Sequence, residues 1–240
     1  MSIIKRTILV TGASSGIGRA IAQTLLQQGH TVIGVSRDCQ KFTRQMDTFK
    51  PVQIDLSRLN ELAPKISHLQ QRFPDINAVV FSAGAGRFGS LEEFSYPQIE
   101  ALMNLNFTSQ VFLTKALLPA LKSKAQSDLI YIGSEAALKG SRKGAIYCAS
   151  KFALRGFTQA LREECGGSNV RVCLINPGMV KTAFFESLNF EPGDHESNSI
   201  SPDDVATAVA YVLASRHHIV IDEINLSPLN KVVKFKKGGT

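Results

Sequence analysis

A tyrosine and a lysine lie one helical turn apart in the stretch Tyr147-Cys148-Ala149-Ser150-Lys151. Residues i and i+4 share one face of a helix, so the phenol and the ammonium can approach each other. A free tyrosine has a pKa of about 10, and a nearby cation lowers that pKa by favouring the phenolate. Tyr147 could then exchange a proton with an alcohol or carbonyl oxygen. The spacing also fits a packed tyrosine beside an exposed lysine, so the pair alone leaves both interpretations open.

Ser134 comes earlier in the chain, directly after an apolar run over Leu129–Ile132 that predicts a strand. In a doubly wound sheet the carboxyl ends of the strands line the ligand crevice, and a hydroxyl there can hydrogen-bond a substrate oxygen. An ordinary turn or capping serine explains the same position. Ser134 is therefore a candidate only in combination with other residues.

A glycine-rich turn, Thr11-Gly12-Ala13-Ser14-Ser15-Gly16-Ile17-Gly18, separates a predicted strand from a predicted helix. Such a turn lets the backbone approach a pyrophosphate, which the free N–H groups and positive dipole end of the helix then bind. A tight turn without a ligand is a simpler alternative. Gly12 to Gly16 also matches G-x-S-x-G, the nucleophile elbow of α/β-hydrolases, which would make this chain an esterase using Ser14. That interpretation needs a later histidine, and His195, His217 and His218 are candidates.

Short Val- and Ile-rich runs alternate with longer segments of helical period. This alternation predicts an α/β fold, a parallel sheet of about seven strands with helices on both faces. The strands are expected at Thr7–Thr11, Thr31–Val35, Val52–Ile54, Ala78–Phe81, Leu129–Ile132, Val170–Ile175 and Ile219–Ile221. The helices are expected at Gly16–Gln28, Leu59–Arg72, Tyr96–Leu121, Gly144–Glu164 and Pro202–Ala214, with a weaker one at Asp38–Asp47.

No domain boundary is visible, so residues 1–240 are expected to form one domain. The longest irregular segment, 176–200, exceeds an ordinary connection and is expected to be a lid or binding loop near the substrate. Apolar candidates for a substrate pocket are Phe88, Leu138, Phe184, Phe185 and Leu188, and Arg87 or Lys139 could meet an anion.

Together these motifs resemble the short-chain dehydrogenase/reductase family, over about Lys5 to Leu226. The resemblance implies a Rossmann-like fold that binds NAD(P). It assigns a catalytic set of Asn106, Ser134, Tyr147 and Lys151. The cofactor contacts that it implies are Gly12, Ser14, Ser15, Gly16, Ile17, Gly18, Asp55, Ala83, Gly84, Tyr147, Lys151, Pro177, Gly178, Val180 and Thr182. One departure is visible, because Phe81-Ser82-Ala83-Gly84 stands where the family usually has Asn-Asn-Ala-Gly.

The resemblance also implies a reaction, the interconversion of an alcohol and a carbonyl by hydride transfer. In it Tyr147 is the general acid or base, Lys151 lowers the Tyr147 pKa and binds the nicotinamide ribose, and Ser134 holds the substrate oxygen. Asn106 is expected to fix a water that links Lys151 to solvent. A homotetramer or homodimer is expected by analogy only. A dinucleotide-sensing protein without catalysis is a further alternative, which the complete set of four residues disfavours.

The residues after the second strand bear on the choice of cofactor. An acid there would bind the 2′-hydroxyl of NAD, whereas an arginine accommodates the 2′-phosphate of NADP. Here Ser36 and Arg37 suit a phosphate, and Asp38 could favour NAD or cap a helix. We therefore expect NADP(H) to be preferred, with NAD(H) possible.

Composition excludes several classes of protein. No apolar run approaches the roughly 20 residues of a membrane span. The formal net charge is +7, but its densest cluster, Lys231, Lys234, Lys236 and Lys237, is short and predicts a solvated basic tail rather than a nucleic-acid arm. The four cysteines form no C-x-x-C pair, so we expect free thiols, no bound metal and a cytoplasmic protein.

Overall fold

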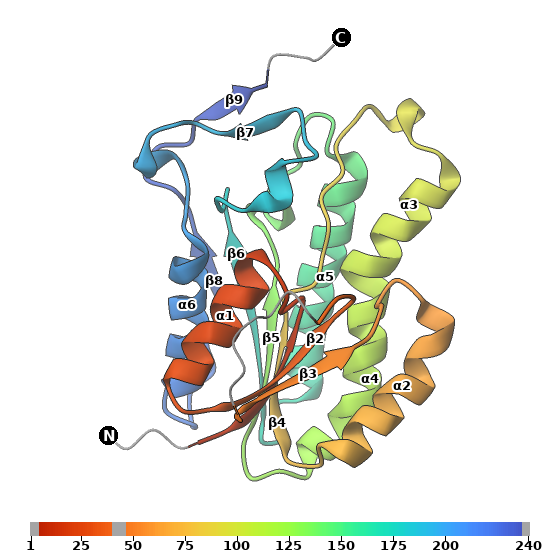
Figure 1. The fold of residues 1–240 in the computed structure, drawn as a ribbon, viewed down its shortest axis with the longest axis vertical. Coiled ribbons are helices and arrows are strands. Elements are labelled where there is room, and N and C mark those ends of the chain that lie inside the picture. Colours follow the sequence, from red (N-terminus) through yellow and green to blue (C-terminus); the bar gives the residue numbers. More distant parts are fainter. Residues whose placement is uncertain (1–4, 40–46, 237–240) are drawn as a thin grey trace.

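The computed structural model describes residues 5–39 and 47–236. Strands and helices alternate along the chain, and Figure 1 shows them as a central sheet with helices packed against it. The weak helix expected over 38–47 falls mostly on residues 40–46, which lie outside the described residues.

Seven parallel strands form the central sheet, in the order β3-β2-β1-β4-β5-β6-β8. They are β1 (Thr7–Thr11), β2 (Thr31–Ser36), β3 (Phe49–Gln53), β4 (Ile76–Phe81), β5 (Ser127–Ile132), β6 (Val170–Pro177) and β8 (Glu223–Leu226). Every residue of β5 and β6 is buried, which explains why these strands lack a polar alternation. The strand order reverses between β1 and β4, and ligands bind open α/β sheets at such a switch point. The predicted doubly wound fold is confirmed.

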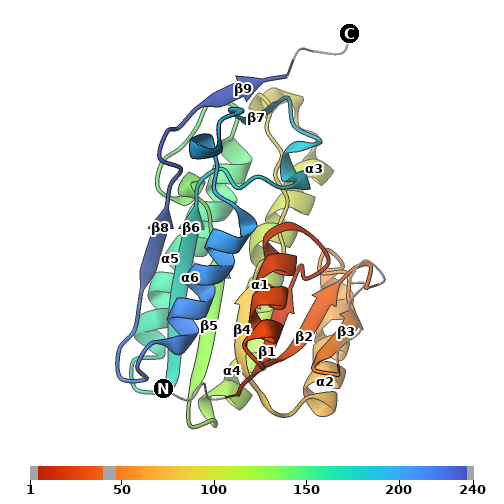
Figure 2. The same ribbon diagram turned by 60° about the vertical axis from the view of Figure 1, so that its left-hand side comes forward.

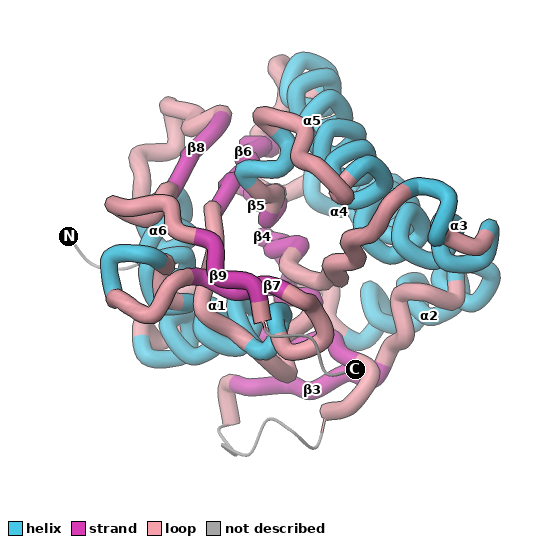
Figure 3. Tube along the Cα trace, turned by 90° about the horizontal axis from the view of Figure 1, so that it is seen from above, coloured by secondary structure: helices cyan, strands magenta, loops and turns pink. Residues whose placement is uncertain are grey.

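Helices cover both faces of the sheet, as Figures 2 and 3 show. α1 (Gly16–Gln27) and α6 (Pro202–Ala214) pack on one face through residues such as Leu25 and Val209. α2 (Leu59–Arg72), α4 (Ser109–Lys122) and α5 (Ala145–Glu164) cover the other face, where Leu62, Leu117 and Leu154 are buried. The sheet is therefore enclosed by two separate apolar cores.

The helix predicted over Tyr96–Leu121 is interrupted. α3 (Tyr96–Met103) begins with the expected capping box of Ser95 and Gln98, and a π-helical turn over Asn104–Thr108 joins it to α4. Single π turns inside α-helices occur frequently at functional sites. Here the turn contains Asn106, whose side chain is completely buried.

The last strand of the sheet is β8, so the prediction of a strand at Ile219–Ile221 is wrong by a few residues. Ile224 and Leu226 pack against the core and β8 pairs with β6, whereas Ile219 is 40% exposed. The Ile219 carbonyl instead accepts a hydrogen bond from Arg171. The apolar run Ile219–Ile221 therefore looked like a strand in the sequence, although the strand begins after it.

The segment 176–200, called here the substrate loop after the role predicted for it, is less irregular than predicted. It contains 3-10 turns at Ala183–Phe185 and Glu196–Asn198 and a short strand β7 (Phe190–Pro192). β7 pairs antiparallel with β9 (Val233–Phe235), at the top of Figure 1. Further 3-10 turns lie at Leu91–Glu93 and Glu135–Ala137. In the part of the chain that the structure describes, no helix is both long and apolar enough to cross a membrane.

Candidate active site

Ser134, Tyr147 and Lys151 meet at the carboxyl end of β5. Ser134 begins the 3-10 turn that follows the strand, and its hydroxyl hydrogen-bonds the Tyr147 hydroxyl. Lys151 lies one turn further along α5, with its Nζ 5.9 Å from the centre of the Tyr147 ring. That Nζ donates a hydrogen bond to the Ile132 carbonyl at 3.1 Å. The spacing in the sequence therefore does bring the phenol, the ammonium and the hydroxyl together.

Burial dominates the ionisation of this group. It raises the pKa of Tyr147 to about 12, against the opposing effect of the Ser134 hydrogen bond. Burial also lowers the pKa of Lys151 to about 8. In this structure the Lys151 ammonium is directed at the Ile132 carbonyl and both groups are buried, so the expectation that Lys151 lowers the Tyr147 pKa stays a prediction.

Asn106 joins the loop after β4 to α5. Its Oδ1 accepts from the Ala85 N–H and its Nδ2 donates to the Ala85 carbonyl, both at 2.9 Å. The same Nδ2 donates to the Ser150 hydroxyl at 3.1 Å. A Cβ on Gly84 would lie 3.2 Å from the Asn106 Oδ1, so the loop approaches this side chain closely. Asn106 thus lies beside the helix turn that carries Tyr147 and Lys151.

Asn176 is a positioning residue that sequence reasoning missed. It is completely buried at the end of β6, and its Oδ1 accepts from the backbone N–H of Ser134 at 3.2 Å. Its Nδ2 donates to Glu223 at 3.1 Å and to Asn225 at 3.0 Å, both on β8. Glu223 in turn pairs with Arg155 of α5. No local pattern signals this role, because the partners come from distant parts of the chain.

The glycine turn fits a dinucleotide pyrophosphate. Gly12 and Gly16 have φ angles of 70° and 50°, which favour glycine, and a Cβ on Gly18 would lie 2.3 Å from the Gly12 carbonyl. No residue in the first turn of α1 is acidic, and the Ser15 side chain makes no capping hydrogen bond. The amino end of α1, which includes Ser14, Ser15 and Ile17 around its start, therefore keeps a positive dipole end for an anion.

Histidine placement argues against the esterase interpretation of Ser14. Ser14 follows the carboxyl end of β1. His217 and His218 lie between α6 and β8, so they are at the amino ends of the parallel strands, away from Ser14. His195 is on the substrate loop, where its Nδ1 hydrogen-bonds Ser197 at 2.8 Å. A serine nucleophile needs a histidine within hydrogen-bond reach.

The residues predicted to read the adenosine ribose lie after β2 and β3. Ser36 is buried and its hydroxyl donates to the Asp38 carbonyl at 3.0 Å, while Arg37 is exposed. Asp55 accepts hydrogen bonds from the Ser57 backbone and hydroxyl, and that hydroxyl is the main cause of its lowered pKa. The Arg37 charge lowers the Asp55 pKa further. Arg37 is therefore an exposed cation near this corner, where Arg58 also lies beside Asp55.

The predicted nicotinamide-side residues follow β6. Pro177 ends the strand, the Gly178 N–H donates to the Leu226 carbonyl at 2.8 Å, and Val180 forms a bridge with Ile200. The Thr182 hydroxyl accepts from the Phe184 N–H, and its methyl would lie 3.4 Å from a Cβ on Gly16. This segment therefore lies beside the glycine turn. Across the switch point, the Thr11 hydroxyl accepts from the Ser82 and Ala83 N–H groups.

Five aromatic rings border the site and are called here the aromatic cluster: Phe88, Tyr147, Phe184, Phe185 and Phe190. Phe88 and Phe184 were predicted to line a pocket, and their ring centres lie 5.0 and 6.1 Å from that of Tyr147. Phe190, which sequence reasoning missed, packs edge-on against Phe88 at 5.0 Å. Leu138 is 38% exposed and Leu188 is buried. Arg87 and Lys139 are exposed.

The C-terminal residues 229–236, called here the strap, are exposed up to residue 235, as the predicted solvated tail would be, but polar contacts hold them against the rest of the molecule. Lys231 pairs with Glu135 at 2.7 Å and Lys234 with Asp194 at 2.8 Å. Lys236 donates to the Phe185 and Glu186 carbonyls. The partners of these lysines, two carboxylates and two backbone carbonyls, come from parts of the chain far from the strap in sequence. Lys237 lies outside the described residues.

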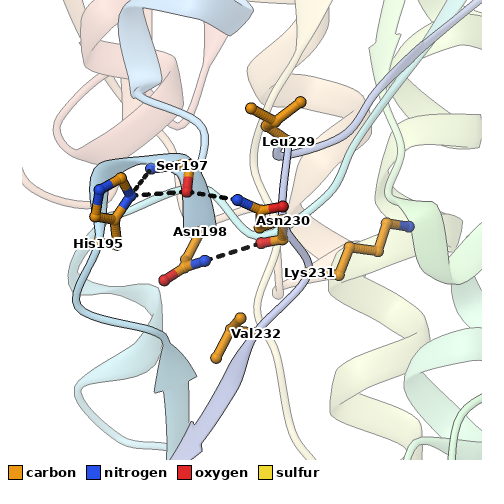
Figure 4. A pocket seen from close by; sticks show the side chains of 7 residues that line it. All are labelled: His195, Ser197, Asn198, Leu229, Asn230, Lys231 and Val232. Carbon is orange, nitrogen blue, oxygen red and sulfur yellow. Dashed lines mark hydrogen bonds between the residues drawn. The ribbon is translucent and has the colours of Figure 1, made fainter.

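A cavity of about 640 Å³ opens between the strap and the substrate loop (Figure 4). Across it, Asn198 donates to the Asn230 carbonyl at 3.1 Å and Asn230 donates to the Ser197 hydroxyl at 3.0 Å. It is lined by His195, Ser197, Asn198, Leu229, Asn230, Lys231 and Val232. None of the four predicted catalytic residues lines it. The cavity is therefore separate from the candidate active site.

The doubly wound sheet and the Ser134, Tyr147 and Lys151 arrangement at the carboxyl end of β5 define a Rossmann-like oxidoreductase. The family model for short chain dehydrogenases matches residues 6–192, and the chain belongs to that family.

Known proteins resemble this chain over nearly its whole length. An uncharacterized oxidoreductase of Staphylococcus aureus (strain MRSA252) is 31% identical over 226 residues, covering 92% of this chain and 96% of the relative. An alcohol dehydrogenase of the archaeon Thermococcus sibiricus, complexed with 5-hydroxy-NADP, has a TM-score of 0.83 and 25% identity, covering 93% of this chain and 96% of that one. Serine dehydrogenase of Escherichia coli has a TM-score of 0.80 and 27% identity, covering 92% of this chain and 96% of that one.

Proposed function

We propose that this oxidoreductase interconverts an alcohol and a carbonyl compound with NADP(H) as its preferred cofactor, and that Tyr147 donates and accepts the proton. The observation that carries the proposal is the Tyr147 hydroxyl, hydrogen-bonded to Ser134 and backed by Lys151 at the carboxyl edge of the sheet. NADP(H) is favoured by the exposed Arg37 and by the NADP derivative bound to the similar alcohol dehydrogenase.

In this proposal the cofactor, when bound, supplies or takes up the hydride. The glycine turn and Thr182 would hold its phosphates and nicotinamide side, and Ser36, Arg37 and Asp55 its adenosine side. Ala83, Gly84, Pro177, Gly178 and Val180 would contribute backbone contacts. The residues fit this group because the turn offers uncapped N–H groups beside Thr182.

The chain's own residues would move the proton. With its pKa near 12, Tyr147 is protonated at neutral pH and is ready to donate to a carbonyl oxygen that Ser134 also binds. In the oxidative direction Tyr147 must first lose this proton, and the charge of Lys151 would stabilise the phenolate. Asn106 would fix a water that links Lys151 to solvent.

The test combines turnover with cofactor binding. Tyr147→Phe should abolish reduction of carbonyl compounds while the dissociation constant for NADPH stays nearly unchanged. Substantial activity in Tyr147→Phe would contradict the proton role. NADPH binding by the wild type without turnover of any carbonyl compound would instead favour the dinucleotide-sensing alternative.

Two further properties belong to the same proposal. We propose a homotetramer or homodimer, supported by the apolar Phe112 on α4 and Phe152 on α5, which are 42% and 44% exposed. We also propose that the protein is cytoplasmic, supported by its free cysteines, and that it has one domain, supported by the single seven-stranded central sheet. Light scattering of the purified protein tests the assembly.

A further inference from the structure

Phe184 is held over a residue that has no side chain. A Cβ placed on Gly86 would lie 2.1 Å from the Cζ of Phe184 and less than 3 Å from two more of its ring atoms. The Phe184 ring therefore lies directly on the backbone of the loop after β4. The Cβ of any other residue at position 86 would clash with the ring in this position. From there its ring reaches Tyr147 at 6.1 Å.

Two adjacent phenylalanines of the substrate loop have different surroundings. Phe185 is buried, and its ring packs against Phe190 of the same loop at 5.9 Å, so it packs inside the loop. Phe184 stays partly exposed beside Tyr147, as does Phe88. Packing inside the loop explains the buried position of Phe185. It does not explain why the rings of Phe184 and Phe88 stay partly exposed beside the Tyr147 phenol.

The substrate must lie against this surface. Its reacting oxygen has to reach the hydroxyls of Tyr147 and Ser134, so the groups on its reacting carbon lie beside the rings that border the phenol. Of the ionic side chains near these rings, Lys231 pairs with Glu135 and Lys236 binds the Phe185 carbonyl, whereas Arg87, next to Phe88 in the chain, is exposed. An aromatic group would gain ring contacts there, worth about 0.5–1.5 kcal/mol per pair in general.

We propose that the active site takes a carbonyl compound, or the matching alcohol, whose reacting carbon carries an aryl group, and that Phe184 placed over Gly86 determines this preference. The proposal rests on the function proposed above. It gives Phe184 a role in specificity, with Gly86 as the residue that positions it.

Three methyl ketones that differ in one substituent test the preference: acetophenone, butanone and pyruvate. For the wild type we expect kcat/KM to be about tenfold higher for acetophenone than for butanone, and lowest for pyruvate. Phe184→Ala should remove most of this advantage and change kcat/KM for butanone little. Tyr96→Ala, at an 89% exposed ring on α3, is the aromatic control and should change neither value.

The Gly86 contact gives a second, independent test. Gly86→Ala should displace the Phe184 ring and lower kcat/KM for acetophenone about as much as Phe184→Ala does. In the Phe184→Ala background the same substitution should add little, because the contact is already gone. A loss of equal size in both backgrounds would show that Gly86 acts apart from Phe184 and would overturn this part of the proposal.

A binding measurement separates this proposal from the proposed function. The chain contains no tryptophan, so Phe184→Trp introduces a single fluorophore at the surface in question. Benzamide, an aryl compound without a reducible ketone, should change its emission at saturation, whereas acetamide should not. The aryl preference is overturned if kcat/KM is highest for butanone or pyruvate, or if benzamide does not change the emission of Phe184→Trp. Absence of turnover for all ketones contradicts the proposed function, and the benzamide result then decides the aryl preference alone.

Discussion

At the scale of single residues, Lys151 illustrates how a group with a proposed catalytic role can cost stability. Burial places its folded-state pKa at about 8, below the value of 10.5 for an exposed lysine. Between those two pH values the unfolded chain binds more protons, so stability rises with pH through that window. Below pH 8 the penalty is fully present, at roughly 3 kcal/mol.

Lys151→Met should therefore stabilise the protein at pH 7 while abolishing activity. After about 1 kcal/mol for the lost hydrogen bond to Ile132, we expect a net gain of about 2 kcal/mol in the free energy of unfolding. The gain should vanish as the pH approaches 10.5. Denaturant titrations at pH 7 and 10 measure this, with the exposed Lys115→Met as the control. A gain that does not depend on pH would refute the explanation.

Arg37 should determine the preference for NADPH. An exposed guanidinium that meets a phosphate contributes about 1.5 kcal/mol, the lower end for charged hydrogen bonds, which is roughly a factor of ten. Arg37→Ala should weaken NADPH binding about tenfold, leave NADH binding unchanged, and make the preference less sensitive to salt. Paired dissociation constants test this. The control is Arg58→Ala, another exposed arginine, whose Nε lies 3.8 Å from Asp55.

At the scale of elements, the β7–β9 pair makes the strap a clamp on the substrate loop. The Gly193 N–H donates to the Val232 carbonyl at 3.0 Å and the Lys236 N–H to the Asn189 carbonyl at 2.8 Å. The ion pairs of Lys231 and Lys234 add contacts at the surface. Exposed pairs contribute about 0–1 kcal/mol to global stability, so their main effect should be local.

The double variant Lys231→Ala/Lys234→Ala should speed amide hydrogen exchange in the substrate loop several-fold. Exchange in β5 and β6 should stay as in the wild type, because the free energy of unfolding changes by less than about 1 kcal/mol. Mass spectrometry of peptides from the loop measures this. Lys50→Ala on β3 is the control, and equal exchange in the loop of all three proteins would show that the clamp does not depend on these lysines.

Sequence patterns predicted the elements whose signal is local. The strand Thr7–Thr11 has the expected bounds, and Ser95 caps α3 as its capping box predicts. The π turn at Asn104–Thr108 was missed because one inserted residue hardly changes the apolar period of a helix. β7 and β9 have only three residues each, and they pair across a long stretch of chain, so neither carries a pattern of its own. For the same reason the sequence could not indicate the hydrogen bond between Asn176 and the Ser134 backbone.

At the scale of the whole molecule, a buried ionic network holds the amino ends of three strands. Asp128 on β5 is 1% exposed and pairs with Arg6, before β1, and with Arg171 on β6 at 2.7 Å. Arg171 also donates to the Val212 and Ser215 carbonyls at the end of α6. The network therefore joins the sheet to a helix at the edge opposite the active site.

Asp128→Asn should destabilise the fold by about 3–5 kcal/mol, because it leaves two buried guanidinium groups without their counter-charge. Activity per folded molecule should be unchanged, since the network is remote from Tyr147. Thermal unfolding and active-site titration measure the two effects. Asp222→Asn, which removes an ion pair to Arg162 at a 69% exposed carboxylate, should cost less than about 1 kcal/mol. Similar losses in both variants would contradict the role of burial.

The pairing of β7 with β9 also bears on the order in which a nascent chain acquires its parts. Synthesis proceeds from the amino end, and β9 emerges after all seven strands of the central sheet. Once β8 has left the ribosome, every strand needed for the two cores is present, while the substrate loop still lacks its clamp. The scaffold can therefore fold before the segment that we propose to contact the substrate is complete. Translation that stops between β8 and β9 should leave a folded, cofactor-binding protein that handles its substrate poorly.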